Sequence, residues 1–158
     1  MGSETFTTAM FLIAAIIASA VLINAAFPVI YTMSGTFSSS AKEADERIRT
    51  DIKIINTYAT TGGEAQIWIK NVGKSRISLA EVSGSDMFIG APGDFERVSK
   101  GSWSAEILED ANENWEYGET LLLTVRSAKI PDSIGRTVYF QFILPNGVMR
   151  STEFTVGG

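Results

Sequence analysis

The 158-residue chain contains no cysteine and no histidine. Without cysteine it can form no disulfide and no thiolate metal site. The Ser-His-Asp and Cys-His catalytic arrangements are excluded as well, because each needs an imidazole. A zinc site would have to use carboxylates alone, which is unusual for that metal. We therefore expect a protein that is not an enzyme and that needs no cofactor.

The chain also has fewer basic than acidic residues: 13 Lys and Arg against 18 Asp and Glu, which gives a net charge of −5. Nucleic-acid binding depends on a basic patch that neutralises phosphates, so no nucleic-acid partner is expected. The sequence carries neither a P-loop nor a G-x-G-x-x-G motif, and nucleotide binding has no support either.

One feature is abundant: an uncharged, strongly apolar run over residues 7–33. About 20 apolar residues in a helix span the ~30 Å hydrocarbon core of a bilayer. This run is apolar on all sides, which is typical of a helix in lipid or among other apolar helices. It is longer than the apolar part of a signal peptide, and no Lys or Arg precedes it, so we expect it to be retained.

The apolar run also predicts self-association. Small residues such as Ala14, Ala18 and Ala20 let neighbouring helices approach closely. The expected contacts of this assembly helix are its large side chains: Phe11, Ile13, Ile16, Ile17, Val21, Ile23 and Phe27.

The helix is predicted to continue to about residue 49, so that residues 1–49 form one helical domain. Beyond the apolar run, the apolar side chains follow the helical spacing i, i+4, i+7 and i+11: Phe37, Ala41, Ala44 and Ile48. Glu43 precedes Arg47 by four residues, the favourable order for an ion pair on a helix. Pro28 is expected to kink the helix or to remove one of its hydrogen bonds.

From residue 50 to 158 the apolar period changes to two, which indicates strands. Ile52, Ile54 and Tyr58 alternate in a first strand; Ala65, Ile67, Ile69 and Val72 are assigned to one face of a second. Further strands are expected at 87–89 and 119–125, and residues 136–144 and 148–156 should form a hairpin around Pro145-Asn146-Gly147. The predicted fold is a long N-terminal helix followed by an immunoglobulin-like antiparallel β-sandwich.

An acidic segment holds the pattern D-x-N-x-N, formed by Asp110, Asn112 and Asn114. Oxygen ligands at alternate positions suit Ca²⁺. An EF-hand would next require Gly and Glu where Trp115 and Leu121 stand. A solvated turn is the favoured interpretation, and the three residues are weak metal-ligand candidates.

The three tryptophans have different expected roles. Trp68 lies in a predicted strand and should pack in the core or at its rim. Trp103 and Trp115 are assigned to loops, and together with Tyr117 they are the candidate contacts with a partner, since exposed aromatic side chains often anchor interfaces.

Several stretches resemble the FlaG family of the archaellum, the archaeal flagellum. They are Met1–Thr8, Phe11–Ile17, Phe27–Tyr31, Asp45–Asp51, Trp68–Gly73 and Trp115–Glu119. The part Lys70–Gly73 is also similar to archaellins and to FlaF, whereas the helix-to-sandwich junction is more specific to FlaG.

This resemblance implies an envelope-anchored stator protein of the archaellum motor, which self-assembles and binds a FlaF-like partner and, through it, the surface layer. The helix would lie in the membrane or a filament core, and the sandwich outside the cell membrane. Counting Lys42, Arg47 and Arg49 favours the opposite orientation.

Two other interpretations stay open. One is a pilin- or archaellin-like subunit of an extracellular filament, although the sequence lacks a basic leader and has Thr7 where such a subunit would carry a carboxylate. The other is a membrane-tethered domain that binds sugar or ions.

Overall fold

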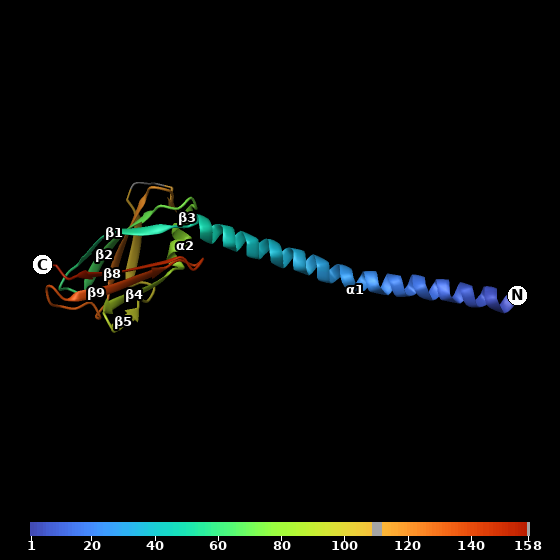
Figure 1. Cartoon of the computed structure of the whole chain (residues 1–158). Coiled ribbons are helices and arrows are strands. Elements are labelled where there is room, and N and C mark those ends of the chain that lie inside the picture. The colour runs from blue at the N-terminus through green and yellow to red at the C-terminus, as the bar shows by residue number, and fades with distance from the viewer. Residues whose placement is uncertain (109–111, 158) are drawn as a thin grey trace. The chain divides into compact units, whose positions relative to one another are not determined.

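The structure is a computed structural model that describes residues 1–108 and 112–157 (Figure 1). It divides into two compact units, Met1–Glu43 and Ala44–Gly158. The division falls inside the first helix, so the last helical residues, 44–49, belong to the same unit as the strands that follow.

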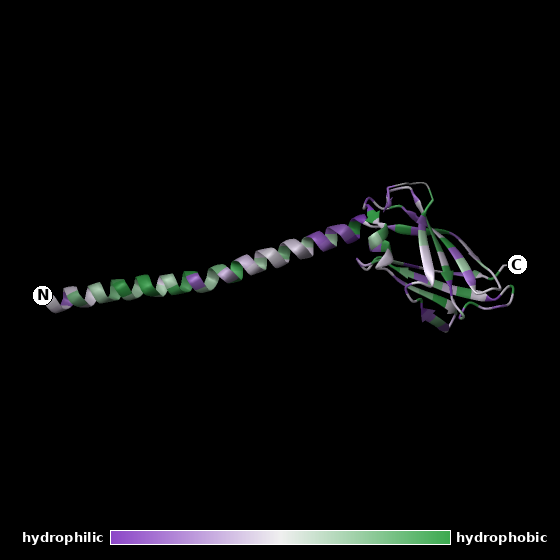
Figure 2. Ribbon diagram, turned by 180° about the vertical axis from the view of Figure 1, so that it is seen from behind, coloured by the Kyte–Doolittle hydropathy of each residue, from purple (hydrophilic) through white to green (hydrophobic). Residues whose placement is uncertain are grey.

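Helix α1 runs from Gly2 to Arg49, as the apolar run and the later helical stripe predict. Figure 2 shows the change along it, from mostly hydrophobic residues near the N-terminus to hydrophilic residues near its end. Its hydroxyl side chains donate to carbonyls of the preceding turn; Ser19 Oγ lies 2.8 Å from the Ala15 oxygen, and Thr32 Oγ1 lies 2.8 Å from the Pro28 oxygen. Polar groups satisfied within the helix are compatible with an apolar surrounding.

The residues described in the second unit form two antiparallel four-stranded sheets. The sheet that we call the β2 sheet has the order β1 (Ile52–Ala59), β2 (Glu64–Asn71), β8 (Thr120–Arg126) and β6 (Trp103–Ile107). The β9 sheet has the order β10 (Met149–Thr155), β9 (Thr137–Ile143), β4 (Asp86–Ala91) and β5 (Asp94–Arg97).

Three short elements complete the unit. Strands β3 (Ile77–Ser78) and β7 (Asn114–Trp115) pair with each other. Helix α2 (Leu79–Ser83) starts at Ser78, whose hydroxyl accepts from the backbone N–H of Glu81 while the Glu81 carboxylate accepts from the backbone N–H of Ser78. This reciprocal capping box stabilises a helix too short to form by itself.

The core lies between the two sheets. Alternate residues of the central strands are fully buried, and both sheets contribute to one hydrophobic cluster, with Ile67 and Leu123 from the β2 sheet and Phe140 from the β9 sheet. This alternation of buried and outward side chains is what a sandwich requires. The predicted fold class, a long helix followed by antiparallel sheets of immunoglobulin-like type, is confirmed.

The predicted hairpin around Pro145-Asn146-Gly147 is also confirmed. Strands β9 and β10 pair from Ile143 with Met149 onward, and the Leu144 N–H donates to the Val148 oxygen over 2.9 Å. Gly147 has φ = +81°, a conformation that residues with a Cβ rarely adopt.

Two predicted facing positions are wrong. A bulge between Ile54 and Asn56 reverses the alternation in β1, so Ala59 is buried and Tyr58 is 41% exposed. Val72 was placed on the buried face of β2, but Asn71 occupies that inward position and Val72 is 37% exposed.

Sequence periodicity also missed α2, β5 and β6. Every residue of β5 is exposed, so this edge strand lacks the apolar alternation that would reveal it. Strand β6 includes Trp103, which was expected in a loop.

Candidate functional site

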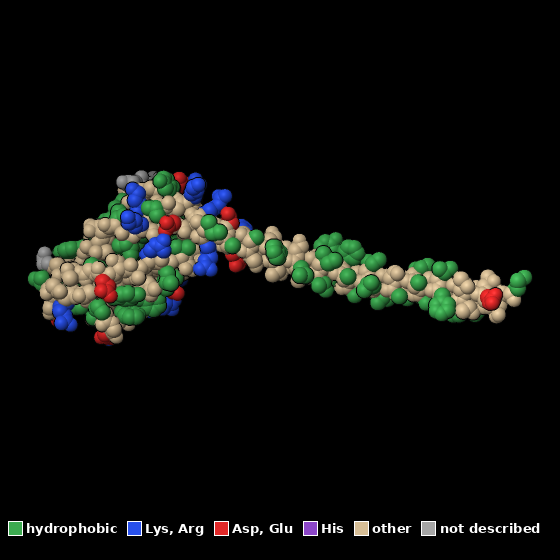
Figure 3. All heavy atoms as spheres, viewed as in Figure 1, with side chains coloured by type: hydrophobic (Ala, Val, Ile, Leu, Met, Phe, Trp, Pro, Cys, Tyr) green, Lys and Arg blue, Asp and Glu red, His purple; other side chains and the backbone are tan. Residues whose placement is uncertain are grey.

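The apolar part of α1 is the largest candidate surface. No residue of α1, all of which the structure describes, is buried. The predicted assembly residues are between 50% and 72% exposed: Phe11, Ile13, Ile16, Ile17, Val21, Ile23 and Phe27. Figure 3 shows hydrophobic side chains spread along the helix. Soluble monomers rarely expose so much continuous apolar surface, so lipid or other helices must cover it in the working protein.

A second candidate region is the turn that receives the end of α1 within the second unit. The Lys74 N–H donates to the Arg49 oxygen over 2.7 Å, and the N–H groups of Val72 and Gly73 both donate to the Asp51 oxygen over 2.9 Å. A Cβ at residue 73 would lie 2.3 Å from the Asp51 nitrogen. Only glycine allows the chain after the helix to pass so close to this turn.

Asn71 holds this turn in place from inside the domain. Its side chain is fully buried; Nδ2 donates to the Ser75 oxygen and to the Trp115 oxygen, each over 2.9 Å, and Oδ1 accepts from the Gly73 N–H over 3.0 Å. The Lys70–Gly73 stretch therefore connects the helix end, through hydrogen bonds, to the segment that carries Trp115.

Trp115 is wrong as a candidate partner contact, because its side chain is fully buried. It lies in β7 rather than in a loop, paired with Ile77, and its Nε1 donates to the Glu119 oxygen over 2.9 Å. The sequence analysis assigned it to a loop, but it is a core residue.

The other two aromatic candidates differ. Trp103 lies in β6, half-buried and packed against the core, so its expected place in a loop is also wrong. Tyr117 is 73% exposed and stays a predicted contact.

The weak metal-ligand candidates Asp110, Asn112 and Asn114 do not come together as a metal site in the part of the chain that the structure describes. Asp110 lies outside the described residues. Asn112 Oδ1 accepts from the Asn114 N–H over 2.8 Å, and Asn114 Nδ2 donates to the Asn112 oxygen over 2.9 Å, so both side chains stabilise a local turn. In the described part of the chain, no three acidic side chains gather as metal ligands would.

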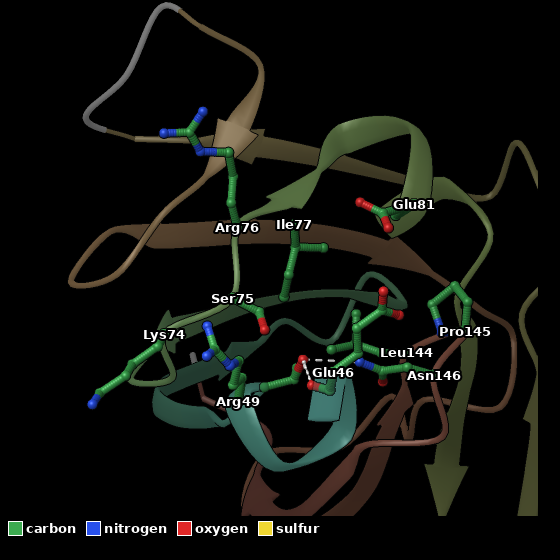
Figure 4. Close-up of a pocket in the computed structure, with 11 residues that line it drawn as sticks. Glu46, Arg49, Lys74, Ser75, Arg76, Ile77, Glu81, Leu144, Pro145 and Asn146 are labelled. Carbon is green, nitrogen blue, oxygen red and sulfur yellow. Dashed lines mark hydrogen bonds between the residues drawn. The ribbon is translucent and has the colours of Figure 1, made fainter. Parts of the chain in front are cut away.

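A pocket of about 340 Å³ adjoins the helix end in the second unit (Figure 4). Its charged lining mixes both signs: Glu46, Arg49, Lys74, Arg76 and Glu81. At its wall Thr50 Oγ1 donates to the Glu46 oxygen over 2.7 Å and accepts from Asn146 Nδ2 over 3.0 Å. These hydrogen bonds connect the helix end to the β9–β10 turn, so the pocket lies where the helix end is held against the sandwich.

Several of the charged groups around the domain are already paired. Arg76 meets Glu116 at 2.7 Å, and Arg126 meets Glu64 at 2.8 Å. At the β5 hairpin, a hydrogen bond from Lys129 to the Asp94 carboxylate, together with its negative charge, raises the pKa of Lys129. Such exposed pairs orient side chains and add little to stability.

Comparison with known proteins identifies the family to which this combination of helix and sandwich belongs. The model of the archaeal-type flagellin family matches residues 2–154, nearly the whole chain. The chain belongs to the archaeal-type flagellin family. It is therefore an archaellum-related structural protein.

A relative in Archaeoglobus fulgidus, named only as an uncharacterized protein, is 26% identical over 161 residues, which cover 98% of this chain and 99% of the relative.

Solved structures with the same fold come from two kinds of archaellum protein. The periplasmic stator protein FlaG of Sulfolobus acidocaldarius matches with a TM-score of 0.56 and 21% identity, over 66% of this chain and 99% of its own. The FlaF and FlaG stator complex of the same organism matches with a TM-score of 0.55 and 20% identity, over 65% of this chain and 87% of its own. The archaeal flagellum of Methanospirillum hungatei matches with a TM-score of 0.71 and 12% identity, over 96% of this chain and 93% of its own.

Proposed function

We propose that the chain is an envelope-anchored stator protein of the archaellum motor, which self-associates and binds a FlaF-like partner. The observation that carries the anchoring is the abrupt change in α1. Over residues 7–33 the helix is uncharged and apolar on all sides, from Ser34 onward it is mostly polar, and all of it is exposed.

The dimensions of α1 fit this role. At 1.5 Å per residue, residues 7–33 extend over about 40 Å, which exceeds the ~30 Å hydrocarbon core of a bilayer. The polar residues 34–49 add roughly 24 Å. This part of the helix would stand in water or beside other proteins, between the membrane and the first strand.

Self-association is supported by a continuous heptad pattern. Residues at seven-residue intervals on one stripe are all apolar: Ile16, Ile23, Ile30, Phe37 and Ala44. The companion stripe is Ile13, Ala20, Phe27, Ser34, Ala41 and Ile48, with one polar member. A 3-4 spacing of this kind is the seam of left-handed helix bundles. In the polar half of the helix, after Met33, the large apolar residues are Phe37 and Ile48. Both lie on these two stripes, and both are at least 80% exposed.

The sandwich would then lie outside the cell membrane, where it could meet a FlaF-like partner and the surface layer. The stator proteins of Sulfolobus acidocaldarius are described as periplasmic, and they share this sandwich fold. The exposed Tyr117 is a proposed contact for such a partner.

The test is fractionation of an archaeal host that makes the full-length chain. After shearing removes external filaments, a stator stays with the membranes, resists alkaline carbonate washing and needs detergent for release. A motility assay of the deletion strain should show loss of swimming with filaments still present. Release by carbonate, or swimming unchanged by the deletion, would contradict the proposal.

The second candidate is a subunit of an extracellular filament. It is favoured by the Methanospirillum hungatei flagellum structure, which covers 96% of this chain, helix included. The same fractionation separates the two, because a filament subunit appears in the sheared material. Intact mass of the purified protein adds an independent criterion: a mature chain that begins at Ser3 after peptidase processing would favour the filament subunit.

A further inference from the structure

The outer face of the β9 sheet, which points away from the core, carries three aromatic rings in contact. Phe88 and Phe95 meet edge to face with ring centroids 6.4 Å apart, and Phe95 and Tyr139 lie 5.0 Å apart. Phe95 is 47% exposed. Further along the same face, Ile143 pairs with Met149, which is 53% exposed.

Gly90 makes this aromatic cluster possible. It stands between Phe95 and Tyr139 in the sheet register, and a Cβ there would lie 2.6 Å from the Phe95 Cα. With no side chain at residue 90, the two neighbouring rings close over the backbone, and Gly90 itself is buried. The sheet therefore presents one continuous aromatic cluster rather than separate rings.

The β2 sheet has an apolar outer face of its own. Trp68 and Leu122 are direct cross-strand neighbours that point outward, since the residues on either side of each are fully buried. Ile55, at the bulge of β1 and next in sequence to Asn56, which pairs with Trp68, is 49% exposed. The two apolar outer faces belong to opposite sheets of one sandwich, so they look in opposite directions.

The charges on the two faces differ in sign. On the β2 sheet, Lys53 and Lys70 stand directly opposite each other and make no ion pair with any residue that the structure describes. Like charges in direct cross-strand register repel, so this pair lowers the stability of the isolated domain. Glu106 faces the same side from β6, two strands away from Lys70.

On the β9 sheet the corresponding charge is acidic. Glu153 lies next to Tyr139 in register and makes no ion pair within the described residues. The other outward charges there, Asp86 and Arg97, neutralise each other.

We propose that the β2 face of one copy of this chain stacks on the β9 face of the next, with Trp68 and Leu122 against the Phe88–Phe95–Tyr139 cluster and the lysine pair beside Glu153. This deepens the proposed self-association and rests on it. A net charge of −5 makes copies repel in general, so a basic patch meeting an acidic one selects this relative placement. Two different faces on opposite sides make the contact heterologous, and such contacts continue into open stacks rather than closed dimers.

The test uses the full-length chain in detergent micelles, where detergent covers α1 and remaining association reports the sandwich. Sedimentation velocity should show concentration-dependent association of the wild type. Lys53→Glu with Lys70→Glu should weaken it more than tenfold, and so should Glu153→Lys. Equimolar mixing of these two variants should restore association into alternating stacks. The native β2 face of the Glu153→Lys variant meets the native β9 face of the lysine variant, and the two charge-reversed faces are complementary as well.

A control of equal charge change is Lys42→Glu with Lys100→Glu, which lies off both faces and should associate like the wild type. Circular dichroism verifies that each variant is folded. The proposal is overturned if the wild type sediments as a monomer at all concentrations, if the face variants behave like the control, or if mixing restores nothing. It is equally overturned if the lysine pair serves only to bind a soluble acidic polymer such as dextran sulfate. None of these outcomes affects the fractionation test of membrane anchoring.

Discussion

Helix α1 and the sandwich differ in what covers their apolar side chains. In the sandwich, alternate strand residues from two sheets bury one another, and the largest of them, Trp115, is completely enclosed. In α1, every large apolar residue is half exposed or more. The first region satisfies its apolar surface within the chain, whereas the second must obtain cover from lipid or from other chains.

The comparison teaches that stability and assembly are separate properties of this protein. A substitution inside the sandwich should change folding and leave membrane association intact. A substitution in α1 should do the reverse. The following experiments test that separation, in order of decreasing expected effect.

The largest effect is expected from Trp115→Ala. The removal of a fully buried indole should cost about 3–5 kcal/mol of the free energy of unfolding, through lost burial and the cavity left behind. Urea unfolding, followed by far-ultraviolet circular dichroism of the backbone, measures the change in the free energy of unfolding. Tyr117→Ala, two residues away and exposed, is the control and should change stability by less than about 0.5 kcal/mol. Equal effects of the two would show that Trp115 is not a core residue.

A nearly equal effect, in the other region, is expected from Ile16→Asp. An aspartate at the centre of a membrane helix costs roughly 2.5–3.5 kcal/mol of insertion free energy, and a helix bundle would reject it for the same reason. Membrane retention and oligomer size should fall, while the sandwich unfolds at an unchanged urea concentration. Ile16→Leu serves as the control. Oligomers of unaltered size by sedimentation would mean that the sandwich faces organise assembly without α1.

A smaller effect should separate two fragments. We expect residues 50–158 to fold alone as a soluble β domain, and residues 44–158 to be more stable by about 1–2 kcal/mol. The longer fragment retains Arg49, whose oxygen accepts from the N–H groups of Lys74 and Ser75, and each such bond contributes about 1 kcal/mol. Urea midpoints of both fragments measure the difference. A disordered shorter fragment would contradict the prediction and show that the domain needs residues 44–49 to fold.

The smallest effect is expected at Ser85, a buried residue whose hydroxyl has no hydrogen-bond partner within the described structure. Ser85→Ala removes an unsatisfied polar group, so stability should stay within about 0.5 kcal/mol or rise slightly. Asn71→Ala is the contrast, because it leaves several buried groups without partners and should cost about 1–3 kcal/mol. Thermal unfolding of the two variants measures both changes in stability. A large loss of stability in Ser85→Ala would indicate that the Ser85 hydroxyl has a hydrogen-bond partner in the folded protein.

Local patterns in the sequence predicted the helix, the change of period after it and the hairpin at residues 145–147. Each of these depends on residues close together in the chain, so the spacing of apolar and turn residues is sufficient. The two facing errors have different origins. Tyr58 was assigned by strict alternation, which a bulge in β1 interrupts. Val72 was assigned against the alternation, which from Ile69 leads to the polar but buried Asn71.

Trp115 illustrates the other kind of error. Polar and acidic residues flank it in sequence, but its surroundings in space come from β3 and from the turn held by Asn71, which lies 44 residues earlier. Strand β5 was missed for the opposite reason, because an exposed edge strand has no apolar pattern to detect.

By itself the sequence determined the division into an apolar helix and a β-rich domain, the absence of imidazole and thiol chemistry, and the family resemblance. Only the tertiary structure decided which residues lie inside, that Asn71 and Gly73 hold the end of the helix, and that the aromatic rings and the unpaired lysines lie on opposite outer faces. The reason is physical: composition and periodicity act along the chain, whereas burial and charge pairing depend on strand register, which distant segments establish together.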